Sequence, residues 1–243
     1  MAIIEFRNVS KKYLMGEVTI NALHDASFTI NKGELVCILG PSGAGKTTCL
    51  NILGGMDSPT FGDVIVDGVN ISILKGKNII KYRRKDIGFV FQFYNLVSNL
   101  TAIENVELAV QLTKDHLEPK GALKLVGLEN RLNNFPSQLS GGEQQRVAVA
   151  GAIAKHPKVL LCDEPTGALD YKTGKQILAL LQDCARKNNM TVVIVTHNSA
   201  IKDMADKVIH FKNGTVTKIE INKNPTPIEM IEWWFYEKSY FYT

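Results

Sequence analysis

Three short runs of apolar residues constrain the fold of this chain more than any other feature. They are residues 35–39 (LVCIL), 159–162 (VLLC) and 192–195 (VVIV). None of them alternates with polar residues, which is typical of parallel strands whose two faces are both covered. Helical periodicity between the runs, as in residues 174–187, indicates helical crossovers. The sequence therefore predicts an α/β fold with a parallel sheet.

Two further patterns accompany this predicted core. Residues 3–9 and 24–30 alternate between apolar and polar side chains, which predicts strands of a small antiparallel sheet. The pairs Gly62-Asp63 and Asp67-Gly68 predict turns in the same β portion. We expect a single domain over residues 1–243, made of a core (1–92 and 157–225), a small antiparallel β subdomain within it, an inserted helical subdomain (93–156) and a tail (226–243).

The composition narrows the range of functions. A net charge of only +4 does not favour nucleic acid as a partner, which usually requires a concentrated basic face. The basic stretch 75–85 is predicted to be a solvated helix face, with a docking patch as the alternative. Four cysteines without a C-x-x-C pair predict neither a disulfide framework nor a zinc site. We see no signal-peptide pattern and no apolar run of about 20 residues, so we expect any membrane role to depend on a partner chain.

A glycine-rich segment follows the first apolar run and precedes a predicted helix. Residues 40–47 read GPSGAGKT and fit the pattern G-x-x-x-x-G-K-[ST] of a phosphate-binding loop, or P-loop. Glycine lets the backbone approach a phosphate closely, and the loop amides and helix N-terminus favour an anion. We expect the Lys46 ammonium to contact the β and γ phosphates and the Thr47 hydroxyl to bind Mg²⁺. The sequence thus predicts a P-loop NTPase core whose nucleotide contacts are Gly40, Pro41, Ser42, Gly43, Ala44, Gly45, Lys46, Thr47 and Thr48.

Polar residues also follow the other two apolar runs. Asp163 and Glu164 come directly after the second run, and neighbouring strand residues point to opposite sides. Asp163 is therefore predicted to bind Mg²⁺ and Glu164 to act as a general base for water. His197 follows the third run; a lone histidine there is usually structural, but ligands bind at this edge of a parallel sheet. His197 could therefore contact a γ-phosphate or hold the attacking water.

A second candidate anion site precedes the helix predicted over residues 144–154. Residues 139–143 read LSGGE, in which Ser140 and Glu143 form a capping box. The capping box explains the serine and the glutamate. It does not explain the two glycines, which weaken the first turn of the helix. Exposed glycine amides at the positive end of a helix could bind phosphate. The sequence thus predicts two phosphate sites for one nucleotide.

Taken in this order along the chain, these motifs resemble those of the ATPase subunit of an ATP-binding-cassette (ABC) transporter, over about residues 1–225. The resemblance implies that two copies of the chain enclose two ATP molecules and that Asp170 lies in a loop crossing the dimer interface. Further roles that it implies are adenine stacking for Tyr13, a Mg²⁺ link for Gln92, γ-phosphate sensing for His197, and contact with the other copy's ATP for Ser140, Gly142 and Glu143. The predicted catalytic residues are thus Glu164, His197 and Gln92, and the predicted metal ligands are Thr47, Gln92 and Asp163.

Finer motifs resemble the lipoprotein-release and macrolide-export branch of that family, notably residues 54–57 (GGMD), 89–96 (FVFQFYNL) and 164–170 (EPTGALD). This resemblance implies a peripheral ATPase at the cytoplasmic face of a membrane that powers a separate permease, in export or in lipid or peptide extrusion. The permease is expected to dock on residues 92–112, with Glu104 in the groove. Three positions depart from the branch pattern, which usually has arginine, serine and aspartate where this chain has Gly151, Tyr171 and Asn198.

Three other interpretations remain open at this point. A mechanical regulator of a membrane partner that transports nothing would have the same motifs. A cassette protein of translation or DNA repair would usually carry two cassettes or a long coiled-coil insertion. A small-molecule kinase would share residues 40–47 but would not need residues 139–143. The aromatic residues of 233–243 are predicted to form an interface, to contact a membrane surface or to pack on the domain itself.

Overall fold

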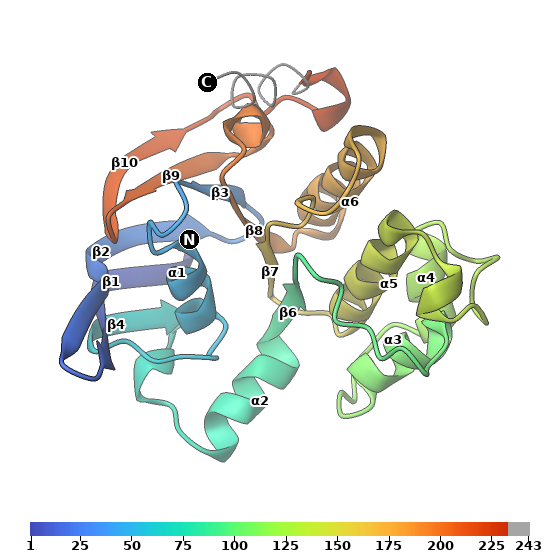
Figure 1. Cartoon of the computed structure of the whole chain (residues 1–243), viewed down its shortest axis with the longest axis horizontal. Helices are drawn as coiled ribbons and strands as arrows, with labels where there is room; N and C mark the ends of the chain where they lie inside the picture. Colours follow the sequence, from blue (N-terminus) through green and yellow to red (C-terminus); the bar gives the residue numbers. More distant parts are fainter. Residues whose placement is uncertain (233–243) are drawn as a thin grey trace.

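The computed structural model describes residues 1–232, which form two sheets flanked by helices (Figure 1). The larger sheet has six strands in the order β10-β9-β3-β8-β7-β6, of which β10 alone is antiparallel to its neighbour. The smaller sheet is antiparallel, in the order β2-β1-β4-β5. The predicted α/β fold is therefore confirmed. The strands are β1 (Ala2–Met15), β2 (Val18–Asn31), β3 (Leu35–Leu39), β4 (Phe61–Val66), β5 (Val69–Asn70), β6 (Ile87–Val90), β7 (Val159–Asp163), β8 (Thr191–Thr196), β9 (Lys207–Lys212) and β10 (Thr215–Ile221).

Each face of the six-stranded sheet packs against its own set of elements, and this explains the unbroken apolar runs. In β3, Leu35, Cys37 and Leu39 join one buried cluster, whereas Val36 and Ile38 join the other. Because successive strand residues point to opposite faces, both faces need apolar side chains. The first cluster packs on α3 (Ala102–Val110), α4 (Pro119–Leu125), α5 (Gly141–Ala154) and α6 (Tyr171–Asn188), and the second on α1 (Lys46–Leu53), α2 (Lys77–Asp86) and the antiparallel sheet.

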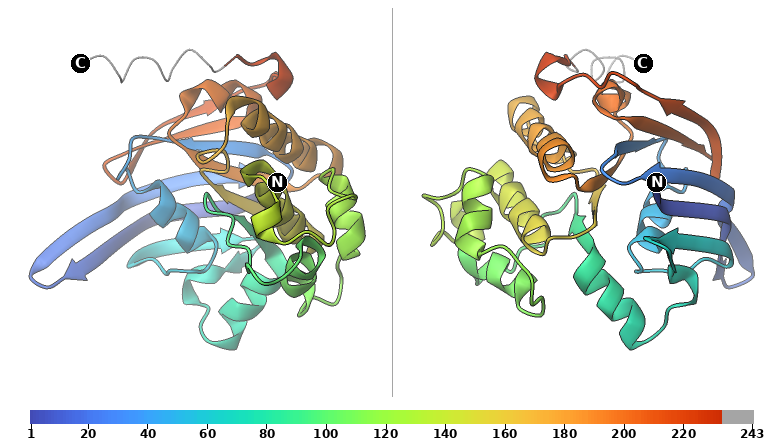
Figure 2. Two further views of the ribbon diagram at one scale, coloured as in Figure 1. Left: turned by 45° about the vertical axis from the view of Figure 1, so that its right-hand side comes forward. Right: turned by 180° about the vertical axis from the view of Figure 1, so that it is seen from behind.

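The helices α3, α4 and α5 lie between strands β6 and β7 in the chain and to one side of the sheet (Figure 2). Ser140 is the N-cap of α5 and forms the predicted capping box with Glu143, so that local prediction is confirmed. Gly151 is buried where α5 meets α3, and a Cβ on it would lie 3.3 Å from the Cβ of Ala109. A Cβ at position 151 would therefore require Ala109 to shift by a few tenths of an ångström. The exact extent of the helical subdomain, residues 93–156, stays a prediction.

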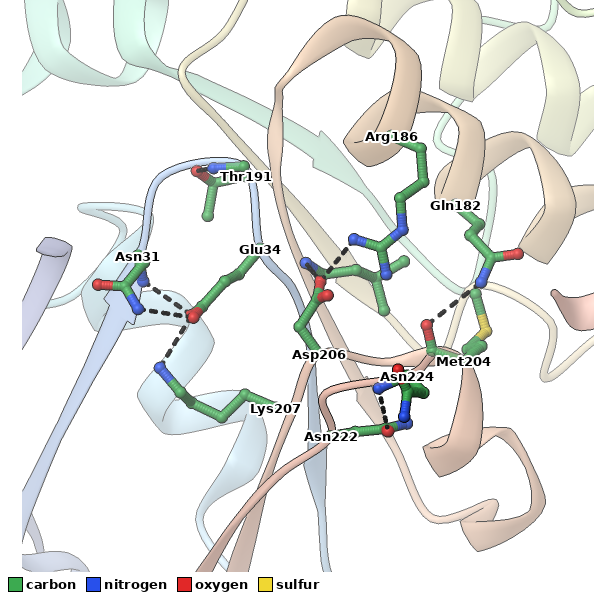
Figure 3. Close-up of polar contacts among 12 residues, drawn as sticks. Asn31, Glu34, Gln182, Arg186, Thr191, Met204, Asp206, Lys207, Asn222 and Asn224 are labelled. Atoms are coloured by element: carbon green, nitrogen blue, oxygen red, sulfur yellow. Dashed lines mark hydrogen bonds and ion pairs between the residues drawn. The ribbon is translucent and has the colours of Figure 1, made fainter. Parts of the chain in front are cut away.

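Ion pairs and hydrogen bonds close the amino-terminal edge of the six-stranded sheet (Figure 3). Lys207, the first residue of β9, donates to Glu34 Oε2 at 2.8 Å, and Glu34 also accepts hydrogen bonds from Asn31. Asp206 Oδ2 accepts from Arg186 of α6 at 2.8 Å and from the Leu35 amide at 2.7 Å. The polar groups at this edge thus satisfy one another.

The first residues of the predicted tail, 226–232, pack on the core. Gln182 of α6 donates to the carbonyl oxygens of Met204 and Thr226 and accepts from the Ile228 amide, and Ile228 is buried. A short 3₁₀ helix, Ile228–Met230, forms there. The aromatic residues of 233–243, for which an interface is predicted, lie outside the described residues. Within residues 1–232, no helix is both long and apolar enough to span a bilayer.

One of the two predicted turns is wrong. Asp67 and Gly68 do connect β4 to β5, whereas Gly62 and Asp63 lie inside β4. Gly62 has φ +84°, beside an irregularity in the pairing of β4 with β1, and a Cβ there would overlap the carbonyl oxygen of Asn8. Position 62 is therefore a glycine because another strand approaches it closely, and not because the chain reverses direction there.

Gly62→Ala and Gly68→Ala form a matched test of this explanation. Both glycines have positive φ, which costs another residue about 1–2 kcal/mol, but only the site at Gly62 lacks space for a Cβ. We expect Gly68→Ala to lower the free energy of unfolding by about 1–2 kcal/mol and Gly62→Ala by about 2–5 kcal/mol, as measured by urea denaturation. Equal losses would show that backbone conformation alone requires the glycine.

Candidate functional site

The strand register brings several predicted site residues to one edge of the larger sheet. Leu39 pairs with Thr196, and Cys162 pairs with both Ile194 and Val90. The parallel strands β3, β8, β7 and β6 therefore end at nearly the same level. The loops that contain Gly40, Gln92, Glu164 and His197 leave the sheet at this carboxyl-terminal edge, where α/β folds bind their ligands.

The glycines of the P-loop are required for different structural reasons. A Cβ on Gly40 would overlap the carbonyl oxygen of Phe211, and one on Gly45 would overlap that of Ala22. Gly43 has φ +76° and open space around it, so its conformation and not its surroundings requires glycine. Gly45 is the N-cap of α1, which places the free amides of the first turn beside the loop. Of the remaining loop residues, Pro41 and Ser42 are exposed, Ala44 is buried, and Thr47 and Thr48 are exposed and half-buried, respectively.

Lys46 is buried within the loop that precedes it. The whole residue is only 7% exposed. Its ammonium donates to the carbonyl oxygens of Gly40 at 2.8 Å and Pro41 at 3.0 Å. Desolvation lowers the pKa of Lys46, and the nearby charges of Glu164 and Asp163 oppose that shift. A partly desolvated ammonium held by neutral acceptors would interact more strongly with a phosphate than with these carbonyl groups.

Asp163 and Thr47 supply two oxygen groups suited to a hard cation. Thr47 Oγ1 lies 3.5 Å from Asp163 Oδ1, a long contact for a hydroxyl and a carboxylate. Burial raises the pKa of Asp163, the contact with Thr47 lowers it, and the charge of Glu164 raises it. A half-buried carboxylate with so weak a partner is incompletely satisfied, and Mg²⁺ prefers carboxylate and hydroxyl oxygens. These residues therefore fit a magnesium ion.

The Glu164 carboxylate is turned toward the end of β8. Oε1 accepts from the amide and from Nδ1 of His197, at 2.9 and 2.8 Å, and Oε2 accepts from Thr196 Oγ1 at 2.9 Å. Glu164 lies one residue beyond β7 at φ +44°, a conformation that non-glycine residues seldom adopt and that is frequent at functional sites. This departure from the strand, and not strand alternation as predicted, separates the carboxylate of Glu164 from that of Asp163.

His197 and Glu164 form a pair in which the two ring nitrogens differ. A carboxylate is an acceptor, so the 2.8 Å contact makes Nδ1 the donor and leaves Nε2 to face another group. The His197 side chain is 70% exposed, whereas that of Glu164 is only 18% exposed. The pair therefore leaves an exposed imidazole beside a mostly buried carboxylate, and the role of His197 toward a ligand stays a prediction.

Gln92 approaches the loop that follows Glu164. It is half-buried, and a Cβ on Gly167 would lie only 2.8 Å from Gln92 Nε2, so the amide packs directly on that glycine. A side chain at position 167 would push the Gln92 amide away from this position. The structure brings Gln92 next to the loop of residues 164–170, and its predicted link to Mg²⁺ stays a prediction.

The LSGGE segment lies apart from the phosphate loop. Helix α5, which it begins, packs in the cluster on the opposite face of the sheet from α1. Ser140 is exposed, and Arg131 donates to Glu143 at 3.0 Å. The expectation that both glycines lie exposed is wrong for Gly142, which is buried because Thr173 of α6 occupies the place of a Cβ.

Tyr13 is anchored through its hydroxyl. It donates to Asp57 Oδ2 at 2.6 Å, and Asp57 Oδ1 pairs with Lys11 Nζ, which also lies 4.8 Å from the centre of the Tyr13 ring. Burial raises the pKa of Tyr13, the bond to Asp57 raises it further, and a bond with Thr48 of α1 lowers it. The ring of Tyr13 is thus held beside the helix that follows the P-loop, as a residue that contacts a base would need to be.

Sequence reasoning assigned no role to Asp57, Thr196 or Gln145. Asp57 belongs to the GGMD motif, and Thr196 lies between the third apolar run and His197, but their partners are far away in the chain. Gln145 is fully buried on α5, on the stripe that includes Gly142, Val149 and Ala152. A glutamine within an apolar stripe at spacings of three and four is a signal that the sequence does contain.

Comparisons with known proteins agree with this geometry. The sequence profile described as ABC transporter matches residues 23–167. The uncharacterized ABC transporter ATP-binding protein MJ0796 of Methanocaldococcus jannaschii is 45% identical over 89% of this chain and 96% of its own length. The lipoprotein-releasing system ATP-binding protein LolD of Syntrophotalea carbinolica is 42% identical over 89% of this chain and 97% of its own length.

Two further similarities concern a longer protein and a solved structure. The macrolide export ATP-binding/permease protein MacB of Pectobacterium atrosepticum is 42% identical over 88% of this chain, which corresponds to 34% of MacB. A dimeric structure of the MJ0796 cassette in a post-hydrolysis state, bound to ADP and phosphate, superimposes with a TM-score of 0.83 at 42% identity. That comparison covers 90% of this chain and 98% of the MJ0796 chain.

The anchoring of Tyr13 can be tested with Asp57→Ala. Loss of one hydrogen bond, worth about 1 kcal/mol, should weaken binding of a fluorescent ATP analogue about five-fold, because the ring is no longer fixed. Tyr13→Phe, which removes only the hydroxyl, should have a similar effect. Asp63→Ala, which removes a hydrogen bond to Asn70 elsewhere in the small sheet, is the control and should bind normally. Unchanged affinity in Asp57→Ala would contradict a role for this anchor.

Proposed function

Because the chain belongs to the ABC transporter family and is an ATPase, we propose that it binds ATP with Mg²⁺, dimerises around two ATP molecules and drives a separate membrane permease. The observation that carries this proposal is the carboxyl-terminal edge of the sheet. There the buried ammonium of Lys46, the oxygens of Thr47 and Asp163, and the hydrogen-bonded pair of Glu164 and His197 all leave neighbouring parallel strands.

In the proposed complex, the phosphates of ATP interact with the P-loop amides and with the Lys46 ammonium. Lys46 would exchange its neutral acceptors, the carbonyl oxygens of Gly40 and Pro41, for charged phosphate oxygens. Thr47, Asp163 and Gln92 would hold Mg²⁺, which neutralises charge on the phosphates when bound. Tyr13, anchored by Asp57, would stack its ring on adenine.

Hydrolysis then requires one proton acceptor and one water molecule in line with the γ-phosphate. Glu164 would accept a proton from that water while the water oxygen forms a bond to the γ-phosphorus. At the same time, the bond between this phosphorus and the oxygen bridging to the β-phosphate breaks, and the electrons of that bond remain on ADP. The carboxylate would exchange one of its present donors for the water. His197, whose Nδ1 is bound to Glu164, would direct Nε2 to the γ-phosphate.

The position of the LSGGE segment supports a role between two copies of the chain. Ser140 is exposed, and α5 packs on the opposite face of the sheet from the chain's own α1. A second copy could therefore receive the end of α5 over its nucleotide, with Ser140 and Glu143 as the contacts, since Gly142 is buried against Thr173. The dimeric MJ0796 structure shows that a cassette similar to this one assembles in pairs.

Residues 92–112 are proposed as the docking surface for the permease, at the cytoplasmic face of a membrane. Phe93, Leu108 and Leu112 are 73%, 50% and 69% exposed, and Val97 is 39% exposed. Several large apolar side chains exposed on one segment are a feature of interaction sites. The similarity to LolD and MacB, whose names refer to lipoprotein release and macrolide export, favours export or extrusion as the permease's activity.

Glu164→Gln tests the proposed mechanism most directly. It preserves the shape of the side chain and removes the base, so hydrolysis should slow by about 10²–10⁴-fold while ATP still binds. Slow hydrolysis should also retain the dimer, so that the variant elutes as a dimer with ATP and as a monomer with ADP on size exclusion. The matched control is Glu107→Gln, which changes an exposed carboxylate on α3 and should hydrolyse ATP normally.

Ser140→Arg in the Glu164→Gln background separates binding from dimerisation. The added side chain should prevent the dimer without preventing nucleotide binding, since Ser140 lies apart from the chain's own P-loop. A Glu164→Gln protein with a near-normal hydrolysis rate would contradict the role of the base. A Glu164→Gln protein that binds ATP tightly and stays monomeric at high concentration would contradict the dimer.

Charge reversal at Glu104 is not a clean test of the proposed docking surface. Glu104 accepts two hydrogen bonds from Thr101, both at 2.7 Å, and completes the capping box of α3, so reversal of its charge would also weaken the helix. Leu108→Asp is cleaner, because Leu108 is exposed on the same helix. It should abolish function in cells and leave the isolated ATPase rate within about two-fold, since a partner contact is lost and the nucleotide site is not.

Leu125→Asp is the matched control for the docking test. Leu125 is 58% exposed on α4, outside residues 92–112, and its substitution should leave function in cells intact. Full complementation by Leu108→Asp, or equal loss with Leu125→Asp, would show that the permease does not dock on this segment.

A further inference from the structure

Gln145 joins two loops of the proposed site through a single amide group. Its Nε2 donates to the carbonyl oxygen of Phe91 at 3.2 Å and to that of Pro165 at 3.1 Å. Phe91 directly precedes Gln92, and Pro165 directly follows Glu164. One side chain on α5 therefore contacts the backbone directly before Gln92, which is proposed to bind the metal, and directly after Glu164, which is proposed to accept the proton.

The other half of the Gln145 amide is not satisfied. Gln145 is 0% exposed, and its Oε1 is a buried oxygen without a hydrogen-bond partner among residues 1–232. Burial of an unpaired amide oxygen is unfavourable, and an apolar side chain of similar size would avoid it. The two hydrogen bonds donated by Nε2 are thus what the structure gains from glutamine at this position.

Gln182 of α6 shows how a buried glutamine with a purely structural role is arranged. Its Nε2 also donates to two backbone carbonyl groups, those of Met204 and Thr226, but its Oε1 accepts from the Ile228 amide. Met204 lies just before β9, a parallel strand that starts at the amino-terminal edge of the sheet. Gln182 is therefore fully paired and remote from the loops that begin at Gln92 and Glu164.

We propose that Gln145 is a positioning residue for ATP hydrolysis. It holds the loop of Gln92 and the loop of Glu164 at a fixed separation beyond Val90 and Cys162, the last residues that β6 and β7 pair with each other. The packing of Gln92 on Gly167 is a second contact between the same loops. Because Gln145 lies on α5, which begins at the LSGGE segment, it also ties both loops to that helix. The inference rests on the roles proposed above for Gln92 and Glu164.

Gln145→Met is the first test, because methionine has a similar length and cannot donate to either carbonyl group. The turnover rate per nucleotide-binding site should fall about ten-fold or more. ATP affinity should stay within about two-fold of that of the unmodified chain, because neither Tyr13 nor residues 40–47 contact the Gln145 side chain among the interactions described. Sites are counted by titration with the fluorescent ATP analogue, so that unfolded protein does not enter the rate.

Gln145→Glu provides a readout in pH. The introduced carboxylate would face two carbonyl oxygens and offer no donor, whereas its protonated form restores one O–H donor. Burial raises the pKa of such a carboxyl group, so protonation should occur within reach of neutral pH. The rate of this variant, relative to the unmodified chain at the same pH, should therefore rise as the pH falls from 8 to 6. A group that only fills space would give a ratio independent of pH.

Gln182→Met is the matched control, with the same substitution at a similarly buried glutamine. It should lower the melting temperature and leave the rate per site unchanged. Rates within two-fold of normal for Gln145→Met and a flat pH ratio for Gln145→Glu would overturn the inference, as would equal losses in Gln145→Met and Gln182→Met. If Gln145→Met does not fold, the pH ratio of Gln145→Glu decides alone. A normal rate in Glu164→Gln is a separate result, which would contradict the proposed mechanism and not the contacts of Gln145.

Discussion

The six-stranded sheet, buried on both faces, is the constraint on which the rest of this structure depends. Its central strands contribute alternate residues to two separate apolar clusters, so their order and register are set from both sides. A shift of one residue would move every side chain of a strand to the wrong face. The level ending of β3, β8, β7 and β6 therefore follows from packing. The chemistry at their carboxyl ends depends on that alignment.

Charge at this edge is concentrated where the surroundings are only partly solvated. Burial lowers the pKa of Lys46 and raises the pKa of Asp163, and the charge of each group shifts the pKa of the other. Glu164 is kept apart by its positive φ and by three donors at the end of β8. The edge thus holds one ammonium and two carboxylates in different surroundings, an arrangement that suits a nucleotide, a divalent cation and one proton acceptor. The amino-terminal edge, by contrast, is closed by its own ion pairs.

Much of the fold and of the candidate site could be predicted from local patterns. The continuous apolar runs predicted the parallel strands because burial on both faces demands them, and GPSGAGKT predicted the P-loop because its constraints act within eight consecutive residues. The capping box of Ser140 and Glu143 is likewise a contact between residues three apart. Gly62 and Gly142 were misjudged because their neighbours, Asn8 and Thr173, are distant in the chain.

The sequence by itself determined the apolar strands β3, β7 and β8, the capping box of α5, the phosphate loop and the family, since each is encoded in the order of neighbouring residues. Only the tertiary structure decided which donors surround Glu164, that Asp57 anchors Tyr13 across 44 positions, and that Gln145 reaches Phe91 across 54. Hydrogen bonds of this kind depend on distances of a few ångströms between side chains on different elements. Those distances are set by the packing of the whole domain, and no local pattern in the chain specifies them.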